Sequence, residues 1–199
     1  MVIKQQIVNF FRKNLLASAS IREISLSLKK SYSKVHQAIK ELEKEGMIKI
    51  EQKGQAKFCS FSFTDEAINY ASFLEEQEAL KRKVPNIIKI LNLKELSDDI
   101  IIVAGSYADY SEKRKSDVDL VVLTSDKNIV KKQKLIENES ITFKPEFHIY
   151  VFNYKDFSEM LFDDKDNYGK EVFKKHLILK NSRKFYELTK EAIRHGYKG

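Results

Sequence analysis

The sequence has few residues of the kinds that cross-link a chain or break its secondary structure. Among 199 residues there are one cysteine (Cys59), two prolines, six glycines and no tryptophan. A single cysteine excludes an intramolecular disulfide framework and a zinc cluster built from cysteines. The low glycine and proline content argues against a fibrous or low-complexity chain. What remains is the composition of a globular protein, with 42% hydrophobic and 33% charged residues.

Long apolar runs are absent as well. The longest aliphatic stretch, residues 100–104, is far shorter than the roughly 20 residues of a membrane-spanning helix. The N-terminal stretch MVIKQQIVNFFRKNLL alternates polar and apolar side chains and lacks the continuous apolar centre of a secretion signal. We therefore expect a soluble, cytoplasmic protein with no membrane partner.

The excess of positive charge lies wholly in the first third of the chain. The net charge is +7, from 36 basic and 29 acidic residues. Residues 1–64 contain 12 Lys and Arg against 5 Asp and Glu, whereas the rest of the chain contains 24 of each. A basic segment joined to a neutral one predicts that the first part binds a polyanion and that the second has another role. The alternative is a lysine-rich surface that serves only solubility.

The basic segment has the pattern of three short helices followed by a hairpin. Apolar residues recur at helical spacing over residues 3–16 and again over about 33–45. Between them, Ser20 and Glu23 have the spacing of a capping box, which predicts the start of the second helix. Alternating residues on both sides of Lys53-Gly54 then predict a β-hairpin.

This order of elements resembles a winged helix-turn-helix, most clearly in YSKVHQAIKELEKEGMIKIEQKGQAKF. The resemblance covers residues 1–64 and implies a recognition helix, a wing and a double-stranded DNA partner. A glutamine on an exposed recognition helix can pair with adenine, and lysines can contact guanine or phosphate. The candidate DNA-binding residues are Ser33, Lys34, His36, Gln37, Lys40, Lys53 and Lys57. A winged helix that contacts another protein is the alternative.

Residues 65–84 have the apolar spacing of a connecting helix, which Pro85 ends. Such a helix can join two domains or pair with its own copy. We take a homodimer as the default, because winged helices often bind palindromic DNA. The chain is thus expected to contain a first domain over 1–64, a connecting helix over 65–84 and a second domain over 85–199.

The second domain contains the candidate catalytic groups. Two short apolar runs, residues 100–104 and 118–123, predict buried strands. The first leads directly into Gly105-Ser106, where glycine lets a phosphate approach the backbone and a helix start would donate N–H groups. Asp117 and Asp119 are two residues apart at the start of the second strand, so both side chains point from the same face.

Two neighbouring carboxylates on an apolar strand repel each other and are costly to bury without a cation. Mg2+ suits one or two carboxylates together with phosphate oxygens. The pattern therefore predicts a magnesium and phosphate site. The alternative is that Asp117 ends the strand and Asp119 is exposed to solvent.

The string G-S-Y-A followed by S-D-V-D-L-V-V resembles the signature of the DNA polymerase beta-type nucleotidyltransferases, in particular the small minimal nucleotidyltransferases of prokaryotes and archaea. The resemblance covers about residues 86–199, including residues 169–196, which are similar to the closing helices of that group. It implies that Gly105 and Ser106 bind a nucleoside triphosphate, with ATP as the first candidate, and that the two aspartates ligate two Mg2+ ions. The implied reaction transfers a nucleoside monophosphate to an acceptor hydroxyl.

The sequence departs from this family at the third catalytic carboxylate. In PEFHIYVFNYKDF, His148 falls where the family has aspartate, and Glu146 lies two residues earlier on the same face. Either Glu146 is the third catalytic residue beside Asp117 and Asp119, or that carboxylate is missing and His148 replaces it. Its loss would leave nucleotide and metal binding possible and put the transfer step in doubt, because the third acid deprotonates the attacking hydroxyl.

The predicted fold is α/β (α+β), with an N-terminal winged helix-turn-helix and a C-terminal nucleotidyltransferase-type domain whose mixed β-sheet is flanked by helices. Three functions follow from it. The first is a nucleotidyltransferase that DNA binding brings to its target. The second is a transcription regulator whose second domain senses nucleotide or only assembles. The third, by family analogy, is an antitoxin-like protein with a toxin-type partner.

Overall fold

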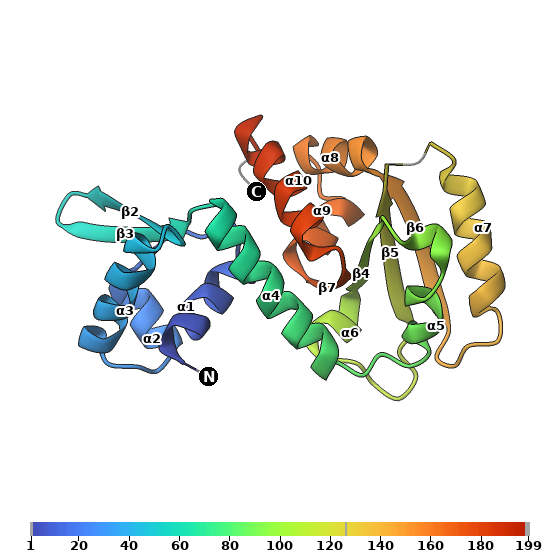
Figure 1. Ribbon diagram of the computed structural model, residues 1–199, viewed down its shortest axis with the longest axis horizontal. Helices are drawn as coiled ribbons and strands as arrows, with labels where there is room; N and C mark the ends of the chain where they lie inside the picture. The colour runs from blue at the N-terminus through green and yellow to red at the C-terminus, as the bar shows by residue number, and fades with distance from the viewer. Residues whose placement is uncertain (1, 126, 198–199) are drawn as a thin grey trace. The chain divides into compact units, whose positions relative to one another are not determined.

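The computed structural model describes residues 2–125 and 127–197, which form a mixed α/β protein with ten α-helices and two β-sheets in this described part (Figure 1). The chain divides into two compact units, unit 1 up to Leu74 and unit 2 over Glu75–Tyr197. The division falls within helix α4 (Asp65–Lys81), and the expected boundaries at residues 64 and 84 lie on either side of it. None of the described helices has both the length and the apolar character needed to cross a membrane.

Unit 1 contains three helices, a small antiparallel sheet in the order β1-β3-β2 and the first part of α4. The elements before α4 are α1 (Ile3–Arg12), β1 (Ala19–Ser20), α2 (Ile21–Ser27), α3 (Tyr32–Lys44), β2 (Ile48–Lys53) and β3 (Ala56–Phe61).

The local signals in unit 1 are confirmed. Ser20 caps α2 by accepting a hydrogen bond from the Glu23 amide, and the Glu23 carboxylate accepts one from the Ser20 amide. The hairpin of β2 and β3 turns at Gly54, whose φ of +63° lies in the left-handed region that favours glycine. Cys59 is buried in β3, as expected for a small core residue. Burial raises the pKa of its thiol to about 11, so the thiol stays protonated.

Unit 2 is built on a four-stranded sheet in the order β6-β5-β4-β7. The β5–β6 pair is parallel and the other two pairs are antiparallel, so the predicted mixed sheet is confirmed. Beyond the second part of α4, its elements are α5 (Ile87–Leu91), η1 (Lys94–Leu96), β4 (Ile100–Ala104), α6 (Gly105–Asp109), β5 (Val118–Thr124), α7 (Ile129–Ser140), β6 (Phe147–Asn153), α8 (Tyr154–Phe162), α9 (Tyr168–Lys174), β7 (His176–Lys180) and α10 (Ser182–Arg194).

The strands predicted at residues 100–104 and 118–123 are confirmed as β4 and β5. The segment 169–196, which resembles closing helices, contains most of α9 and all of α10, but strand β7, which was not predicted, lies between them. Strand β7 pairs with the free edge of β4, and Leu177 and Ile178 are buried there. This pairing completes the sheet at the edge opposite β6.

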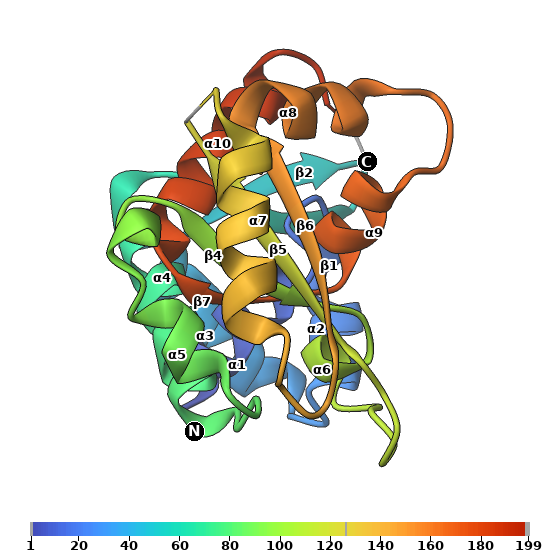
Figure 2. The same ribbon diagram turned by 90° about the vertical axis from the view of Figure 1, so that its right-hand side faces the viewer.

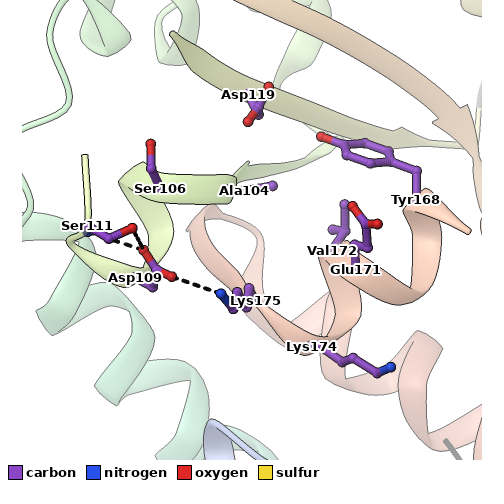
Figure 3. A pocket seen from close by; sticks show the side chains of 11 residues that line it. Ala104, Ser106, Asp109, Ser111, Asp119, Tyr168, Glu171, Val172, Lys174 and Lys175 are labelled. Carbon is purple, nitrogen blue, oxygen red and sulfur yellow. Dashed lines mark hydrogen bonds and ion pairs between the residues drawn. The ribbon is translucent and has the colours of Figure 1, made fainter. Parts of the chain in front are cut away.

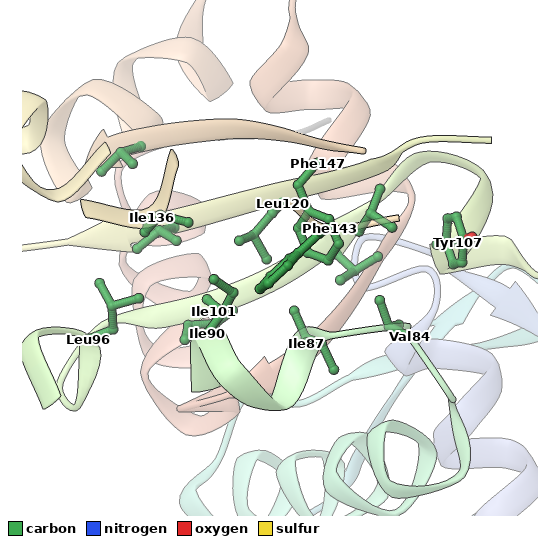
Figure 4. Close-up of a cluster of buried hydrophobic side chains, with 14 residues drawn as sticks. Val84, Ile87, Ile90, Leu96, Ile101, Tyr107, Leu120, Ile136, Phe143 and Phe147 are labelled. Atoms are coloured by element: carbon green, nitrogen blue, oxygen red, sulfur yellow. The ribbon is translucent and has the colours of Figure 1, made fainter. Parts of the chain in front are cut away.

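Helices cover both faces of this sheet. Figure 2 shows α5 and α7 on one face, with α8, α9 and α10 on the other. Val118, Leu120 and Val122 of β5 point toward α5 and α7 and join the main core cluster, to which Ile136 of α7 also belongs (Figure 4). Because side chains alternate along a strand, Asp119 points to the opposite face, toward α9.

Candidate active site

The turn from β4 into α6 packs directly against Asp119. Ala104 and Asp119 are paired in the register of β4 and β5. Gly105 follows Ala104 with a φ of +61°, and a Cβ atom at this position would collide with the Asp119 Oδ2 atom. Glycine therefore suits this position in two ways, by its backbone conformation and by leaving the space that the carboxylate occupies. The predicted turn and the predicted carboxylate form one site.

The two aspartates share a histidine neighbour on the next strand. His148 of β6 is paired with Asp119 in the parallel register of β5 and β6. The His148 Nδ1 atom lies 3.4 Å from Asp119 Oδ1, and its Nε2 atom lies 3.9 Å from Asp117 Oδ2. Both carboxylates therefore face one imidazole ring, as expected for residues two apart on a strand.

Glu146 contributes to this region through its backbone. Its carbonyl accepts a hydrogen bond of 2.9 Å from the Val118 amide, which ties the start of β6 to the start of β5. Its side chain is exposed and forms no hydrogen bond or ion pair with the residues that the structure describes. His148, in contrast, contacts both aspartates.

A cleft of about 390 Å³ opens beside these groups (Figure 3). One wall is the end of β4 with α6 and the following loop, and the opposite wall is α9 with the residue that precedes β7. The lining residues are Ala104, Gly105, Ser106, Asp109, Ser111, Asp119, Tyr168, Glu171, Val172, Lys174 and Lys175.

The cleft holds donors that a bound anion can use. The Ser106 hydroxyl and the Lys174 ammonium have no hydrogen-bond or ion-pair partner within residues 2–125 and 127–197. Lys175 is different, because it pairs with Asp109 at 3.1 Å across the cleft. Hydrogen bonds from Ser111 and the Lys175 ammonium lower the pKa of Asp109, so this carboxylate is negative at neutral pH.

The donor groups suit a divalent cation that brings its own phosphate ligands. Asp117 and Asp119 direct carboxylate oxygens to the same side of β5. Among the described residues, no three His, Cys, Asp or Glu side chains are already arranged to hold a metal ion. Mg2+ commonly takes one or two protein carboxylates and completes its coordination with water and substrate phosphates. The two aspartates therefore fit a Mg2+ ion that takes its remaining ligands from water or from phosphate oxygens.

The candidate DNA-binding residues lie on two elements of unit 1. Five are on α3, and Lys53 and Lys57 are on the two strands of the hairpin. Six of the seven are exposed, and His36 is half-buried. The His36 ring stacks on Tyr32, with centroids 5.8 Å apart, and Gln37 donates a hydrogen bond to Glu41. His36 and Gln37 are thus engaged with neighbouring side chains, whereas the lysines of this surface are exposed.

The acidic residues of α3 are partly neutralised. Lys4 of α1 pairs with Glu41 at 2.9 Å and with Glu45 at 2.7 Å. A hydrogen bond from Lys4 lowers the pKa of Glu41, which keeps this ion pair formed at neutral pH. The negative charge that these two glutamates would present beside the α3 lysines is therefore reduced.

The family model described as HVO_A0114 matches residues 16–68. No curated protein and no solved structure matches the chain. The matched residues lie entirely in unit 1, so they do not include the cleft of unit 2.

Arg82 is a site residue that sequence reasoning missed, because it stands in the predicted connecting segment. Its Nε atom donates a hydrogen bond of 2.9 Å to the Tyr107 carbonyl at α6, and its guanidinium pairs with Glu112 at 2.6 Å. It also lies over the Tyr110 ring, 4.3 Å from the centroid. Arg82 thereby fixes α6 and the loop that leads to the aspartates. No local pattern indicates such a contact.

Tyr168 was missed for a similar reason. The sequence DDKDNYG predicts a turn between helices, and the structure has that turn at residues 163–167, after which Tyr168 begins α9. The ring of Tyr168 packs against Tyr150 of β6 at 4.4 Å between centroids. Aromatic alternation in β6 is visible in the sequence, but its partner on α9 is not.

Proposed function

We propose that this protein transfers a nucleoside monophosphate from a nucleoside triphosphate, with ATP as the first candidate, to an acceptor hydroxyl. The observation that carries this proposal is the packing of Gly105 against Asp119. The turn at the start of α6 thereby lies beside Asp119, one of two partly exposed carboxylates that face the same imidazole, and this combination supports a site for a phosphate and a cation. These are the two halves of a site for a metal-bound triphosphate, here in a nucleotidyltransferase-type domain over residues 85–199.

Each residue has a distinct role in this proposal. The Gly105-Ser106 turn binds the triphosphate through backbone N–H groups and the Ser106 hydroxyl. Asp117 and Asp119 hold Mg2+. When bound, Mg2+ neutralises charge on the phosphates and favours departure of pyrophosphate. Asp109 and Lys175 hold the two walls together through their ion pair.

Transfer of label from α-labelled ATP in the presence of Mg2+ tests this function. Acceptors to be screened are duplex and single-stranded nucleic acids, other proteins and the chain itself. The variants Asp117→Asn and Asp119→Asn should each abolish transfer. Asp98→Asn is the matched control, because the Asp98 side chain is 92% exposed and lies outside the cleft. Equal transfer by the wild type and Asp119→Asn would overturn the proposal.

We further propose that unit 1 is a winged helix-turn-helix that binds double-stranded DNA and brings the transferase to its target. Three helices followed by an antiparallel hairpin support this proposal, as does the exposure of Lys34, Lys40, Lys53 and Lys57. The reduced negative charge beside α3 also favours a polyanionic partner.

A second candidate function is nucleotide binding without transfer, in a DNA-binding regulator. The observation that favours it is the position of His148, which faces both aspartates where the family has a third carboxylate. A histidine there does not supply the anionic base that activates a hydroxyl in this family. Binding of Mg2+ and ATP with no transfer to any screened acceptor would establish this second function in place of the first.

A further inference from the structure

The hydroxyl group of Tyr168 is buried without a hydrogen-bond partner in the described part of the chain. Tyr168 lines the candidate nucleotide cleft, and Figure 3 shows its hydroxyl pointing across the cleft toward Asp119. Buried hydroxyl groups are nearly always hydrogen-bonded, because an unpaired one loses the bond it would make to water. A molecule bound in the cleft can therefore supply the hydrogen-bond acceptor that the Tyr168 hydroxyl lacks.

The backbone on either side of Tyr168 is firmly held. Asn167 caps α9 by accepting a hydrogen bond from the Lys170 amide, and its own amide group donates to the Met160 carbonyl at 2.7 Å. On the other side, a Cβ atom at Gly169 would lie 2.8 Å from the Met160 Cβ atom, so only glycine lets α9 approach α8 this closely. The start of α9 is thereby fixed against α8.

Aromatic packing fixes the ring itself. Tyr150 and Phe152 point from β6 to the same face as His148, and their ring centroids lie 4.4 Å and 6.5 Å from that of Tyr168. The hydroxyl group cannot turn toward bulk water without breaking this packing. A polar group that is held so rigidly and still lacks a partner is typical of a preorganised binding site.

The hydroxyl is available as a hydrogen-bond donor, because a phenol keeps its proton at neutral pH. It lies in the same cleft as the unpaired Ser106 hydroxyl, which belongs to the opposite wall (Figure 3). Two hydroxyl donors that line one cleft suit a ligand rich in acceptor oxygens, as a polyphosphate is.

We propose that Tyr168 is a nucleotide-binding residue whose hydroxyl donates a hydrogen bond to a phosphate oxygen of the bound triphosphate. The inference rests on the proposed nucleotide function of the same cleft and adds a residue from its α9 wall.

Calorimetric titration of the full chain with Mg2+ and α,β-methylene ATP tests the proposal. This analogue cannot transfer its nucleotide, so binding is measured without turnover. In the variant Tyr168→Phe the dissociation constant should rise about tenfold, the effect of losing one hydrogen bond to a charged group. The melting temperature without ligand should stay the same or increase, because the change removes an unpaired buried hydroxyl.

Tyr150→Phe is the matched control, since it removes a hydroxyl from the neighbouring ring, which does not line the cleft. Its dissociation constant should equal that of the wild type. An unchanged dissociation constant in Tyr168→Phe, with or without a lower melting temperature, would overturn the inference. The proposed function would remain intact, provided that the wild type binds the analogue and Asp119→Asn does not. If the wild type does not bind the analogue, the proposed function and this inference both fail.

Discussion

At the scale of single residues, the contact between Gly105 and Asp119 is the most demanding feature of the site. Gly105→Ala introduces a methyl group where the Asp119 carboxylate lies, at a φ of +61°. We expect the left-handed conformation to cost about 1–2 kcal/mol and the overlap to cost about 1–3 kcal/mol more. The displaced carboxylate should also abolish binding of Mg2+ and ATP. Chemical denaturation and calorimetric titration measure the two effects.

Gly54→Ala separates these two contributions. Gly54 has nearly the same φ, +63°, but a Cβ atom added there would have open space around it. This control variant should be destabilised only by the cost of the left-handed conformation, and its nucleotide binding should equal that of the wild type. Equal destabilisation of the two variants would show that the Asp119 carboxylate moves aside without cost, and the close packing would then not define the site.

His148 provides a second prediction at this scale. His148→Asp places three carboxylates together, and in the absence of metal their repulsion should lower stability by about 1 kcal/mol. Added Mg2+ should remove this deficit, because a third carboxylate is expected to increase Mg2+ affinity about tenfold. The melting temperature of the variant should therefore respond to Mg2+ far more than that of the wild type. His148→Asn, which adds no charge, should show no such response.

The residues of the site differ in how well the sequence predicts them. Gly105, Asp117 and Asp119 stand close together in the chain, and their spacing predicts that they lie in one site, which the structure confirms. Tyr168 and Arg82 reach the same site from distant segments, so only the pairing of strands and helices brings them there. The sequence leaves two candidates for the third catalytic position, and contact with both aspartates is observed for His148.

At the scale of elements, the sequence predicts a helix or strand well where interactions within one short segment determine its structure. The capping box at Ser20, the hairpin turn at Gly54 and the continuous apolar run of β4 each act within a few residues, and all three are confirmed. Strand β7 is different, since its five residues lie between two helical patterns and directly follow two lysines. Its strand form depends on the edge of β4, about 75 residues earlier.

The loop after α6 gives the prediction at this scale. Arg82→Met removes the hydrogen-bond donor of the buried Tyr107 carbonyl and the partner of Glu112. We expect a loss of about 1–3 kcal/mol for the unpaired carbonyl, measured by chemical denaturation, and weaker nucleotide binding because α6 is no longer held. Arg183→Met, which removes an exposed ion pair with Glu187, should lose about 0.5 kcal/mol or less.

The contribution of the Glu112–Arg82 ion pair to the free energy of unfolding should also depend on pH. Arg82 lowers the pKa of Glu112 in the folded protein below that of the unfolded chain. The stabilisation is therefore complete above the ordinary glutamate pKa and is lost as the pH falls through the lowered value. The stability difference between the wild type and Arg82→Met should shrink in acid. A constant difference across this range would mean that the ion pair does not contribute.

At the scale of the whole molecule, the chain carries two sites with opposite electrostatic preferences. The whole excess of positive charge lies in residues 1–64, whereas the cleft of unit 2 is lined by the carboxylates Asp109, Asp119 and Glu171. Because the two sites belong to different compact units, each should respond to its own substitutions. Asp119→Asn should therefore leave DNA binding unchanged.

The salt dependence of DNA binding measures the first of these sites. Each lysine that neutralises a phosphate releases about one counterion, so Lys34→Ala and Lys53→Ala should each lower the slope of log affinity against log salt by about one, and the double variant by about two. Fluorescence anisotropy of a labelled duplex at several salt concentrations gives this slope. Lys155→Ala is the matched control, because this exposed lysine lies on α8 of unit 2 and should leave the slope unchanged. If all five proteins share one slope, the lysines do not contact phosphates, and unit 1 recognises a protein partner instead.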